Sequence, residues 1–185
     1  MSTLTVSRAA ELDELVRAVR AATTHSAGWR DTADRVAAAL QAHLPPLDLL
    51  PAGLLDGAPG TSASHRLHVE PDGSFSMVAI VWQPGARTRI HDHVTWCVFG
   101  VLAGAEHEDL YTLADDGASL IEAGSSLNPT GSVSGFAPPG DVHRVRNAGD
   151  TTAVSLHIYG TDLNRIGSSA RRWYDLPIRP ANARD

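Results

Sequence analysis

Two histidines separated by one residue, His91 and His93, form the pair with the clearest chemistry in this chain, and His143 follows fifty residues after the second. Side chains two positions apart on a β-strand project from the same face of the sheet, so His91 and His93 would point toward one ion. A third imidazole from another strand would complete a site that keeps open coordination positions. Neutral imidazole suits iron, zinc, copper and nickel. The spacing therefore predicts a transition-metal site that performs chemistry.

The residues next to this pair are predicted to divide between two faces. If the strand continues past His93, Thr95 and Cys97 share the histidine face, whereas Asp92 points to the opposite side. Asp92 is therefore expected to support the metal ligands from outside rather than to bind the metal.

The elements that must position these residues fall into a helical part and a β-rich part. Apolar residues recur at helical spacing over 7–24 and 29–43, and Pro45-Pro46 ends the second stretch. From about residue 63 onward, short β-rich segments alternate with Gly, Pro, Asp and Asn, which is typical of a β-sandwich or barrel. We therefore predict one mainly β domain, 1–185, with a helical cap at 1–62, a β-barrel at 63–160 and an extended C-terminal segment at 161–185.

Composition excludes several classes of function. The net charge is −6 and no basic stripe stands out, so nucleic-acid binding is not expected. No apolar run is long enough to span a bilayer and no signal peptide is evident, so no membrane role is expected. The chain has no lysine, which excludes a Schiff-base lysine and a P-loop lysine. Cys97 is the only cysteine, and a cytoplasmic location is the simplest interpretation.

The spacing of these residues resembles the two motifs of the cupin superfamily. The matching positions are Gly85, His91, His93 and Gly104 for the first motif, and Pro138, Gly140, His143 and Asn147 for the second. Cys97 stands where cupins usually have a glutamate ligand, and the glycine expected before the second motif is one place off, at Gly131. The resemblance implies a double-stranded β-helix, the small jelly-roll barrel of the cupins.

Two features resemble the thiol dioxygenases, the cysteine dioxygenase family, over about residues 62–175. Replacement of the cupin glutamate by cysteine or glycine is one mark of that family. The other is the polar face formed by Ser155, His157 and Tyr159 in the segment 153–160, which is similar to the family's hydrogen-bond relay beside the metal. The sequence of the first motif, His-Asp-His-x-x-Trp-x-Val-x-Gly-Val-Leu-x-Gly, most closely resembles that of the bacterial 3-mercaptopropionate dioxygenase type.

The resemblance implies one mononuclear Fe(II) held by His91, His93 and His143. The substrates would be O2 and a small thiol such as 3-mercaptopropionate or cysteine, and both oxygen atoms would go to sulfur to give a sulfinate. Three neutral histidines leave the metal's charge for the substrate to offset, which favours an anionic soft ligand such as a thiolate.

Cys97 is the first place where the chain departs from its relatives. Mammalian cysteine dioxygenase has a cysteine that forms a thioether with the relay tyrosine, but here the spacing from His93 is one residue shorter. A crosslink between Cys97 and Tyr159 and a small buried thiol therefore both stay open. Either way, Cys97 belongs with Ser155, His157 and Tyr159 in the predicted catalytic set.

The group that would bind a substrate carboxylate is the second departure. Arginine is the expected residue because its planar fork pairs with a carboxylate through two hydrogen bonds. The candidates are Arg66, two residues after Ser64 and on the same strand face, and Arg171 or Arg172 after the relay. A solvated charged pair is the alternative for Arg171-Arg172.

Two other functions stay open at this point. A three-histidine site that binds zinc also activates water for hydrolysis or hydration, so a cupin enzyme of different chemistry is the first. The second is a non-catalytic metal- or ligand-binding cupin, against which the Ser155, His157 and Tyr159 face argues, because a passive binder requires no relay. The oligomeric state is also open, with a homodimer through strand edges as one option.

Overall fold

The computed structural model describes residues 3–24 and 28–181. Two helices begin the chain, α1 (Thr3–Thr23) and α2 (Trp29–Ala42), and both confirm the helices predicted from apolar spacing. Two single-turn 3-10 helices, η1 (Leu47–Leu49) and η2 (Ala52–Leu54), then lead to the first strand. Within the described ranges, no helix is long and apolar enough to cross a membrane.

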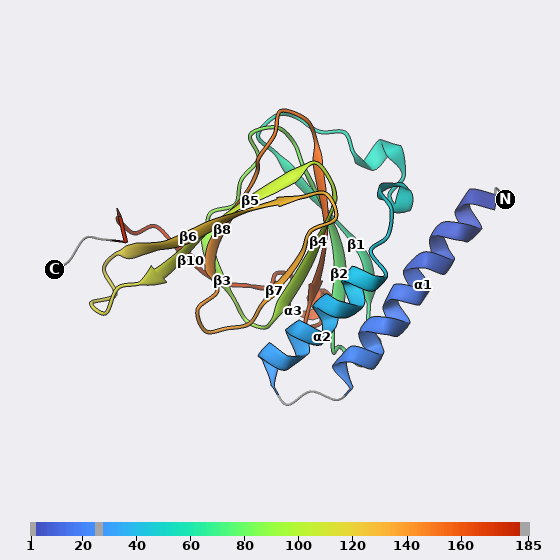
Figure 1. Ribbon diagram of the computed structural model, residues 1–185, viewed down its shortest axis with the longest axis horizontal. Helices are drawn as coiled ribbons and strands as arrows, with labels where there is room; N and C mark the ends of the chain where they lie inside the picture. Colours follow the sequence, from blue (N-terminus) through green and yellow to red (C-terminus); the bar gives the residue numbers. More distant parts are fainter. Residues whose placement is uncertain (1–2, 25–27, 182–185) are drawn as a thin grey trace.

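The strands form two sheets, which Figure 1 shows curled around a common interior. One sheet has the order β1-β2-β9-β4-β7 and the other the order β10-β3-β8-β5-β6-β11. All pairings between named strands are antiparallel except the one between β11 and β6. The strands of the first sheet are β1 (Ser62–Val69), β2 (Ser76–Trp82), β4 (Cys97–Ala103), β7 (Val133–Phe136) and β9 (Ala153–Tyr159). Those of the second are β3 (Ile90–His93), β5 (Ala105–Leu113), β6 (Leu120–Pro129), β8 (Val142–Asn147), β10 (Ala170–Tyr174) and β11 (Ile178–Arg179). The predicted mainly β barrel with N-terminal helices is confirmed.

The two faces of strand β9 point to different parts of the molecule. One face packs into the apolar core between the first sheet and the helices, and the other faces the polar interior of the barrel. The alternate residues Val154, Leu156 and Ile158 of β9 join the core cluster that includes residues of α1 and α2. Figure 1 shows these helices covering the outside of the first sheet. The residues between them, Ser155 and His157, therefore point into the barrel.

The helical layer lies very close to the first sheet at Gly100 on β4. A Cβ atom at this position would lie 2.6 Å from Leu44 Cδ1 and 3.1 Å from Leu40 Cδ2. A larger side chain would therefore have to displace the ends of the Leu44 and Leu40 side chains, so β4 packs closely against the helical layer here. Because β4 and β9 are neighbours, this packing fixes the strand that carries Ser155 and His157.

The strand that carries His91 and His93 does not continue to Cys97, so the condition under which Thr95 and Cys97 would share the histidine face is not met. Strand β3 ends at His93 in the second sheet, and β4 begins at Cys97 in the first. The chain crosses between the sheets at Val94, whose N–H donates to the Ser169 carbonyl at 2.9 Å. Face alternation holds only within one strand, so Cys97 reaches the interior from the sheet that faces the histidines.

The end of the chain is more regular than the extended segment predicted at 161–185, whose last four residues lie outside the described ranges. A single helical turn, α3 (Leu163–Ile166), is followed by β10 and β11, which pair with β3 and β6. In Figure 1 the β5–β6 hairpin reaches beyond the barrel on the side away from the helices, and β11 pairs with β6.

Candidate functional site

His91, His93 and His143 meet in the barrel interior. Strand pairing places His91 directly opposite His143 across β3 and β8. All three side chains are buried, and each offers one ligand atom within 4.8 Å of the other two. Their ring centroids lie 4.7 to 5.0 Å apart. This is the cluster that the sequence spacing predicts, and among the described residues it is the one group of this size able to hold a metal.

Each of the three rings is oriented by an oxygen acceptor at Nδ1. The bonds run from His91 to the Arg89 carbonyl (2.9 Å), from His93 to Asp141 Oδ2 (3.1 Å) and from His143 to Glu108 Oε1 (2.5 Å). A carbonyl or carboxylate oxygen only accepts, so Nδ1 carries the hydrogen and Nε2 keeps a free lone pair. His143 Nε2 is buried and has no hydrogen-bond partner in the described structure. An orphaned, buried lone pair of this kind fits a metal ligand.

Burial also keeps two of these rings neutral. Burial, with repulsion from His143 and His93 when these are charged, lowers the pKa of His91 to about 3. Burial likewise lowers the pKa of His93, although the hydrogen bond to Asp141 acts in the opposite direction. A neutral ring offers its lone pair to a cation, so no proton has to be displaced at neutral pH.

Asp92 does not support the histidine rings as expected. It points to the opposite face of β3, where its Oδ2 accepts from Arg172 Nε at 2.9 Å and from the Tyr174 hydroxyl at 3.1 Å. These bonds tie β10 to β3 instead. The acids that do hold the rings, Asp141 and Glu108, stand outside the first motif, and only the fold identifies them, with Glu108 on β5 and Asp141 directly before β8.

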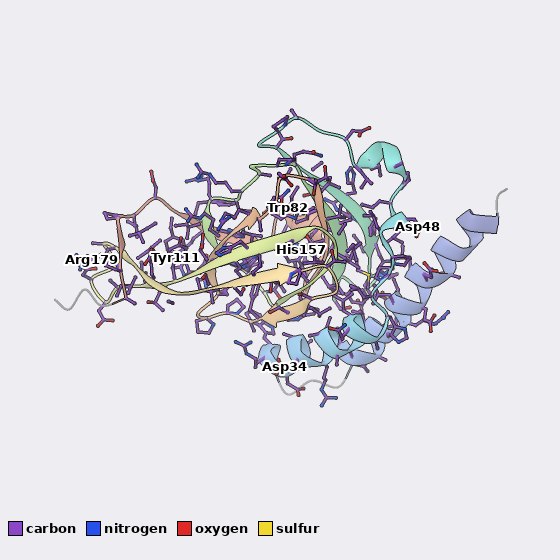
Figure 2. All side chains as sticks on the ribbon, turned by 45° about the horizontal axis from the view of Figure 1, so that its top comes forward. Asp34, Asp48, Trp82, Tyr111, His157 and Arg179 are labelled. Atoms are coloured by element: carbon purple, nitrogen blue, oxygen red, sulfur yellow. The ribbon has the colours of Figure 1, made fainter. Side chains whose placement is uncertain are left out.

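The predicted relay on β9 is connected by hydrogen bonds. The Ser155 hydroxyl lies 2.8 Å from His157 Nε2, and His157 Nδ1 lies 3.3 Å from the Tyr159 hydroxyl. Trp82 Nε1 donates to Ser155 Oγ at 3.0 Å, a contact that the sequence analysis did not predict. Figure 2 shows His157 in the barrel interior. The relay is therefore anchored on β2 and runs toward Tyr159.

Cys97 and Tyr159 face each other across β4 and β9. Their Cα atoms are partners in the sheet register, and Cys97 Sγ lies 3.9 Å from His157 Nδ1. Burial, reinforced by the negative charges of Glu108 and Glu106, raises the pKa of the Cys97 thiol well above its usual value. Burial also raises the pKa of Tyr159. Both groups are therefore protonated at neutral pH.

Of the three arginines predicted to bind substrate, Arg66 lies next to the relay. It lines a cavity of about 150 Å³ whose wall also includes Tyr159, Ser64 and Ser169. Arg66 Nη1 donates to Asn164 Oδ1 at 2.5 Å. Arg172 is bound to Asp92 on the face of β3 that points away from the metal cluster, and Arg171 is exposed beside the same strand.

Trp173 is a further residue at the site that sequence reasoning did not single out. Its ring centroid lies 5.2 Å from that of His91, because β10 pairs Trp173 directly with this histidine. The Arg89 guanidinium lies over the outer side of the same indole, at 5.4 Å from the centroid. Trp173 therefore covers one edge of the cluster, and only the pairing of β10 with β3 reveals it.

The family model for cysteine dioxygenase type I matches residues 61–172, which include every strand of the barrel up to β9. This chain belongs to that family. The three histidines, the relay on β9 and Cys97 all fall within the match. The family accordingly supports an oxygen-incorporating oxidoreductase with a single metal centre of three histidines.

The chain is also similar to several solved structures. The chain is similar to a recombinant oxalate oxidase in complex with glycolate, at 21% identity and a TM-score of 0.44, over 57% of this chain and 53% of that one. It is similar to a cupin-like protein from Thermotoga maritima at 21% identity and a TM-score of 0.44, over 62% of this chain and 77% of that one. A Cupin 2 conserved barrel domain protein from Salinispora arenicola matches at 20% identity and a TM-score of 0.42, over 61% and 86% of the two chains. The match spans about half of the oxalate oxidase chain, and likenesses of this size concern the fold alone.

Proposed function

We propose that this protein is a non-haem iron thiol dioxygenase, which adds both atoms of O2 to the sulfur of a small carboxylated thiol and releases a sulfinate. Membership of the cysteine dioxygenase family supports this reaction. The observation that carries it is a buried cluster of three imidazoles whose Nδ1 atoms are all engaged and whose ligand atoms converge. No carboxylate joins the described cluster, so a neutral ligand set would leave the metal's charge to be offset by a thiolate.

His91, His93 and His143 would hold Fe(II) through Nε2. The bound iron would supply coordination positions for the thiolate and O2 and the redox chemistry that joins them. The protein's own contribution is to fix these positions: Asp141 and Glu108 hold two rings in one orientation, and Trp173 covers the edge of His91. Such outer contacts stiffen a metal site and raise the basicity of its ligands.

The cavity beside Tyr159 is the proposed binding site for the rest of the substrate. Its volume of about 150 Å³ admits only a small molecule, and Val78, Ile80 and Leu163 give it an apolar wall. Arg66 would bind a carboxylate at the mouth, after releasing its hydrogen bond to Asn164. This arrangement favours Arg66 over Arg171 and Arg172, and it suits 3-mercaptopropionate, cysteine or a related carboxylated thiol.

Ser155, His157 and Tyr159 would orient the reactants and hold protons beside them. The Tyr159 hydroxyl lies at the end of the relay, and Tyr159 also lines the cavity, so we propose this hydroxyl as the group that would donate toward a bound substrate. Cys97 would either limit the volume beside Tyr159 as a buried thiol or be joined to it as a thioether. Mass spectrometry of an alkylated tryptic digest decides this: complete alkylation of Cys97 rejects the crosslink.

Oxygen uptake by the Fe(II)-loaded protein tests the proposal. The panel consists of cysteine, 3-mercaptopropionate, mercaptosuccinate, cysteamine and a blank without thiol. We expect rapid uptake with a carboxylated thiol, matched by formation of one sulfinate for each O2 consumed, and little uptake with cysteamine, which lacks the carboxylate. No uptake above the blank with iron fully bound would overturn the proposal.

A further inference from the structure

Glu106 is a buried acid that neither the metal cluster nor the relay accounts for. Its side chain is 0% exposed, and neither carboxylate oxygen has a hydrogen-bond partner in the described structure. It lies on β5 two residues before Glu108, so both acids point into the barrel. Glu108 is used to hold His143, whereas Glu106 Oε1 lies 3.8 Å from Nε2 of His157.

An isolated buried carboxylate is costly, because the interior offers no water to solvate its charge. Such a group is stable only when it is paired with a cation or carries a proton itself. The groups that face the His157 ring come from four strands: Glu106 on β5, Cys97 and Phe99 on β4, Ser155 and Tyr159 on β9, and, at longer range, His93 on β3. The negative member of this set is Glu106, and its nearest potential cation is His157.

We propose that Glu106 is a positioning residue that pairs with a protonated His157 and thereby fixes the direction of the relay. A doubly protonated ring donates at both ends, from Nε2–H toward Ser155 and Glu106 and from Nδ1–H toward Tyr159. Trp82, which can only donate, already gives its hydrogen to one lone pair of Ser155 Oγ, and the second lone pair of this oxygen would accept the hydrogen of His157 Nε2.

The consequence appears at the Tyr159 hydroxyl. When it accepts the hydrogen of His157 Nδ1, its own hydrogen is left for another acceptor: Cys97 and Ser169 also contact this hydroxyl, and a substrate in the cavity lined by Tyr159 and Arg66 would be a third partner. A neutral ring that accepts at Nδ1 would take that hydrogen instead. For the part that concerns catalysis, this inference rests on the proposed function, because the hydrogen that Tyr159 presents is useful only if a substrate binds in that cavity.

The test is nitrogen NMR of ¹⁵N-histidine-labelled protein loaded with Zn(II), which is diamagnetic. Loss of a signal pair in His157→Gln assigns the ring. We expect wild-type protein at pH 7 to show hydrogen on both nitrogens of His157, and Glu106→Gln to show hydrogen on only one. Glu106→Asp should restore the doubly protonated ring, because it restores the charge.

Glu108→Gln is the matched control, since it changes the neighbouring buried acid on the same face of β5. Glu108→Gln should leave the His157 signals unchanged and weaken the retention of zinc. Glu106→Gln should change the His157 signals and leave the retention of zinc unchanged. A His157 ring with a single hydrogen in the wild type, or identical His157 signals in wild type and Glu106→Gln, would overturn the proposal. If Glu106→Gln does not fold, the wild-type spectrum, assigned with His157→Gln, still shows whether the His157 ring carries one hydrogen or two.

Kinetics on the iron-loaded enzyme give the second readout. We expect Glu106→Gln to lower kcat by about tenfold with KM for the thiol unchanged, because the relay and not the substrate contact is altered. An unchanged kcat would remove Glu106 from the relay. If wild-type enzyme oxidises no thiol, the proposed function fails, but the NMR comparison still determines whether Glu106 and His157 form a charged pair.

Discussion

Three histidines, His93, His143 and His157, each lie beside an acidic side chain in the barrel interior. Only the first two form a hydrogen bond with it. His143 and Glu108 are 2.5 Å apart and His93 and Asp141 are 3.1 Å apart, whereas His157 and Glu106 are 3.8 Å apart. The bonded acids fix the orientation and tautomer of rings that would hold a metal, a task that requires rigidity. The unbonded acid, Glu106, lies beside His157, whose ring nitrogens contact the Ser155 and Tyr159 hydroxyls instead. Because a hydroxyl both donates and accepts, the direction of the hydrogen bonds at His157 is adjustable, whereas at the acid-bonded rings, the fixed region, the direction is set by a carboxylate that only accepts.

The largest effect should follow from removing a ring of the fixed region. His143→Ala deletes the ligand whose Nε2 is buried and unpartnered, and we expect it to lose the bound iron and all measurable thiol oxidation. Metal analysis after gel filtration and oxygen uptake provide the measurement. His107→Ala, on the same sheet but outside the cluster, is the control. Stoichiometric iron in His143→Ala would reject the three-histidine site.

Removing the adjustable ring should separate metal binding from turnover. We expect His157→Ala to keep iron at the wild-type level and to lower kcat by about a hundredfold, because the relay to Tyr159 is broken while the three metal ligands are untouched. Iron content and oxygen uptake are measured on the same sample. Wild-type turnover in this variant would remove the relay from the mechanism.

A change to one of the bonded acids should weaken the metal site without removing it. Glu108→Gln keeps the shape of the side chain but removes the charge that holds His143 Nδ1, and we expect metal affinity to fall between about ten- and a hundredfold. Competition with a chelator of known affinity measures this. Asp109→Asn, which affects a neighbouring acid bound to Arg144, should leave the affinity unchanged. Equal affinities in the two variants would contradict the role given to Glu108.

The substrate arginines offer a smaller and more specific effect. We expect Arg66→Ala to raise KM for a carboxylated thiol by about tenfold and to leave kcat nearly unchanged, because it removes a contact present throughout the reaction. Arg172→Ala is the control, since Arg172 is bound to Asp92 on the face away from the metal cluster. A larger rise in KM for Arg172→Ala than for Arg66→Ala would place the carboxylate at β10.

Residue spacing was sufficient to predict the helices, the β-rich part and the shared face of His91 and His93, because periodicity within a strand determines which side chains share a face; His143, on another strand, joined them through the resemblance to the second cupin motif. Residue spacing failed at the crossing between β3 and β4, where the rule was applied beyond the end of a strand. Contacts between distant strands also escaped it: Glu108 and Trp173 reach the histidines only because β5 and β10 pair with β8 and β3. Such pairings depend on the register of the whole sheet, which local patterns do not contain.

The smallest effect should be the acid sensitivity of the metal-free protein. The pKa of His91 falls from 6.5 to about 3 on folding because of burial, so between these pH values the unfolded chain binds more protons than the folded chain. The contribution of His91 to the free energy of unfolding should therefore be constant above pH 6.5, and it should decrease as the pH is lowered from 6.5 toward 3. The slope is at most about 1.4 kcal/mol per pH unit for each such histidine, and His93 acts in the same direction. Urea unfolding of metal-free wild type and His91→Gln at pH 7 and pH 5 measures it. The wild type should lose more stability between the two pH values than the variant does, whereas equal losses would mean that His91 is not held neutral by burial.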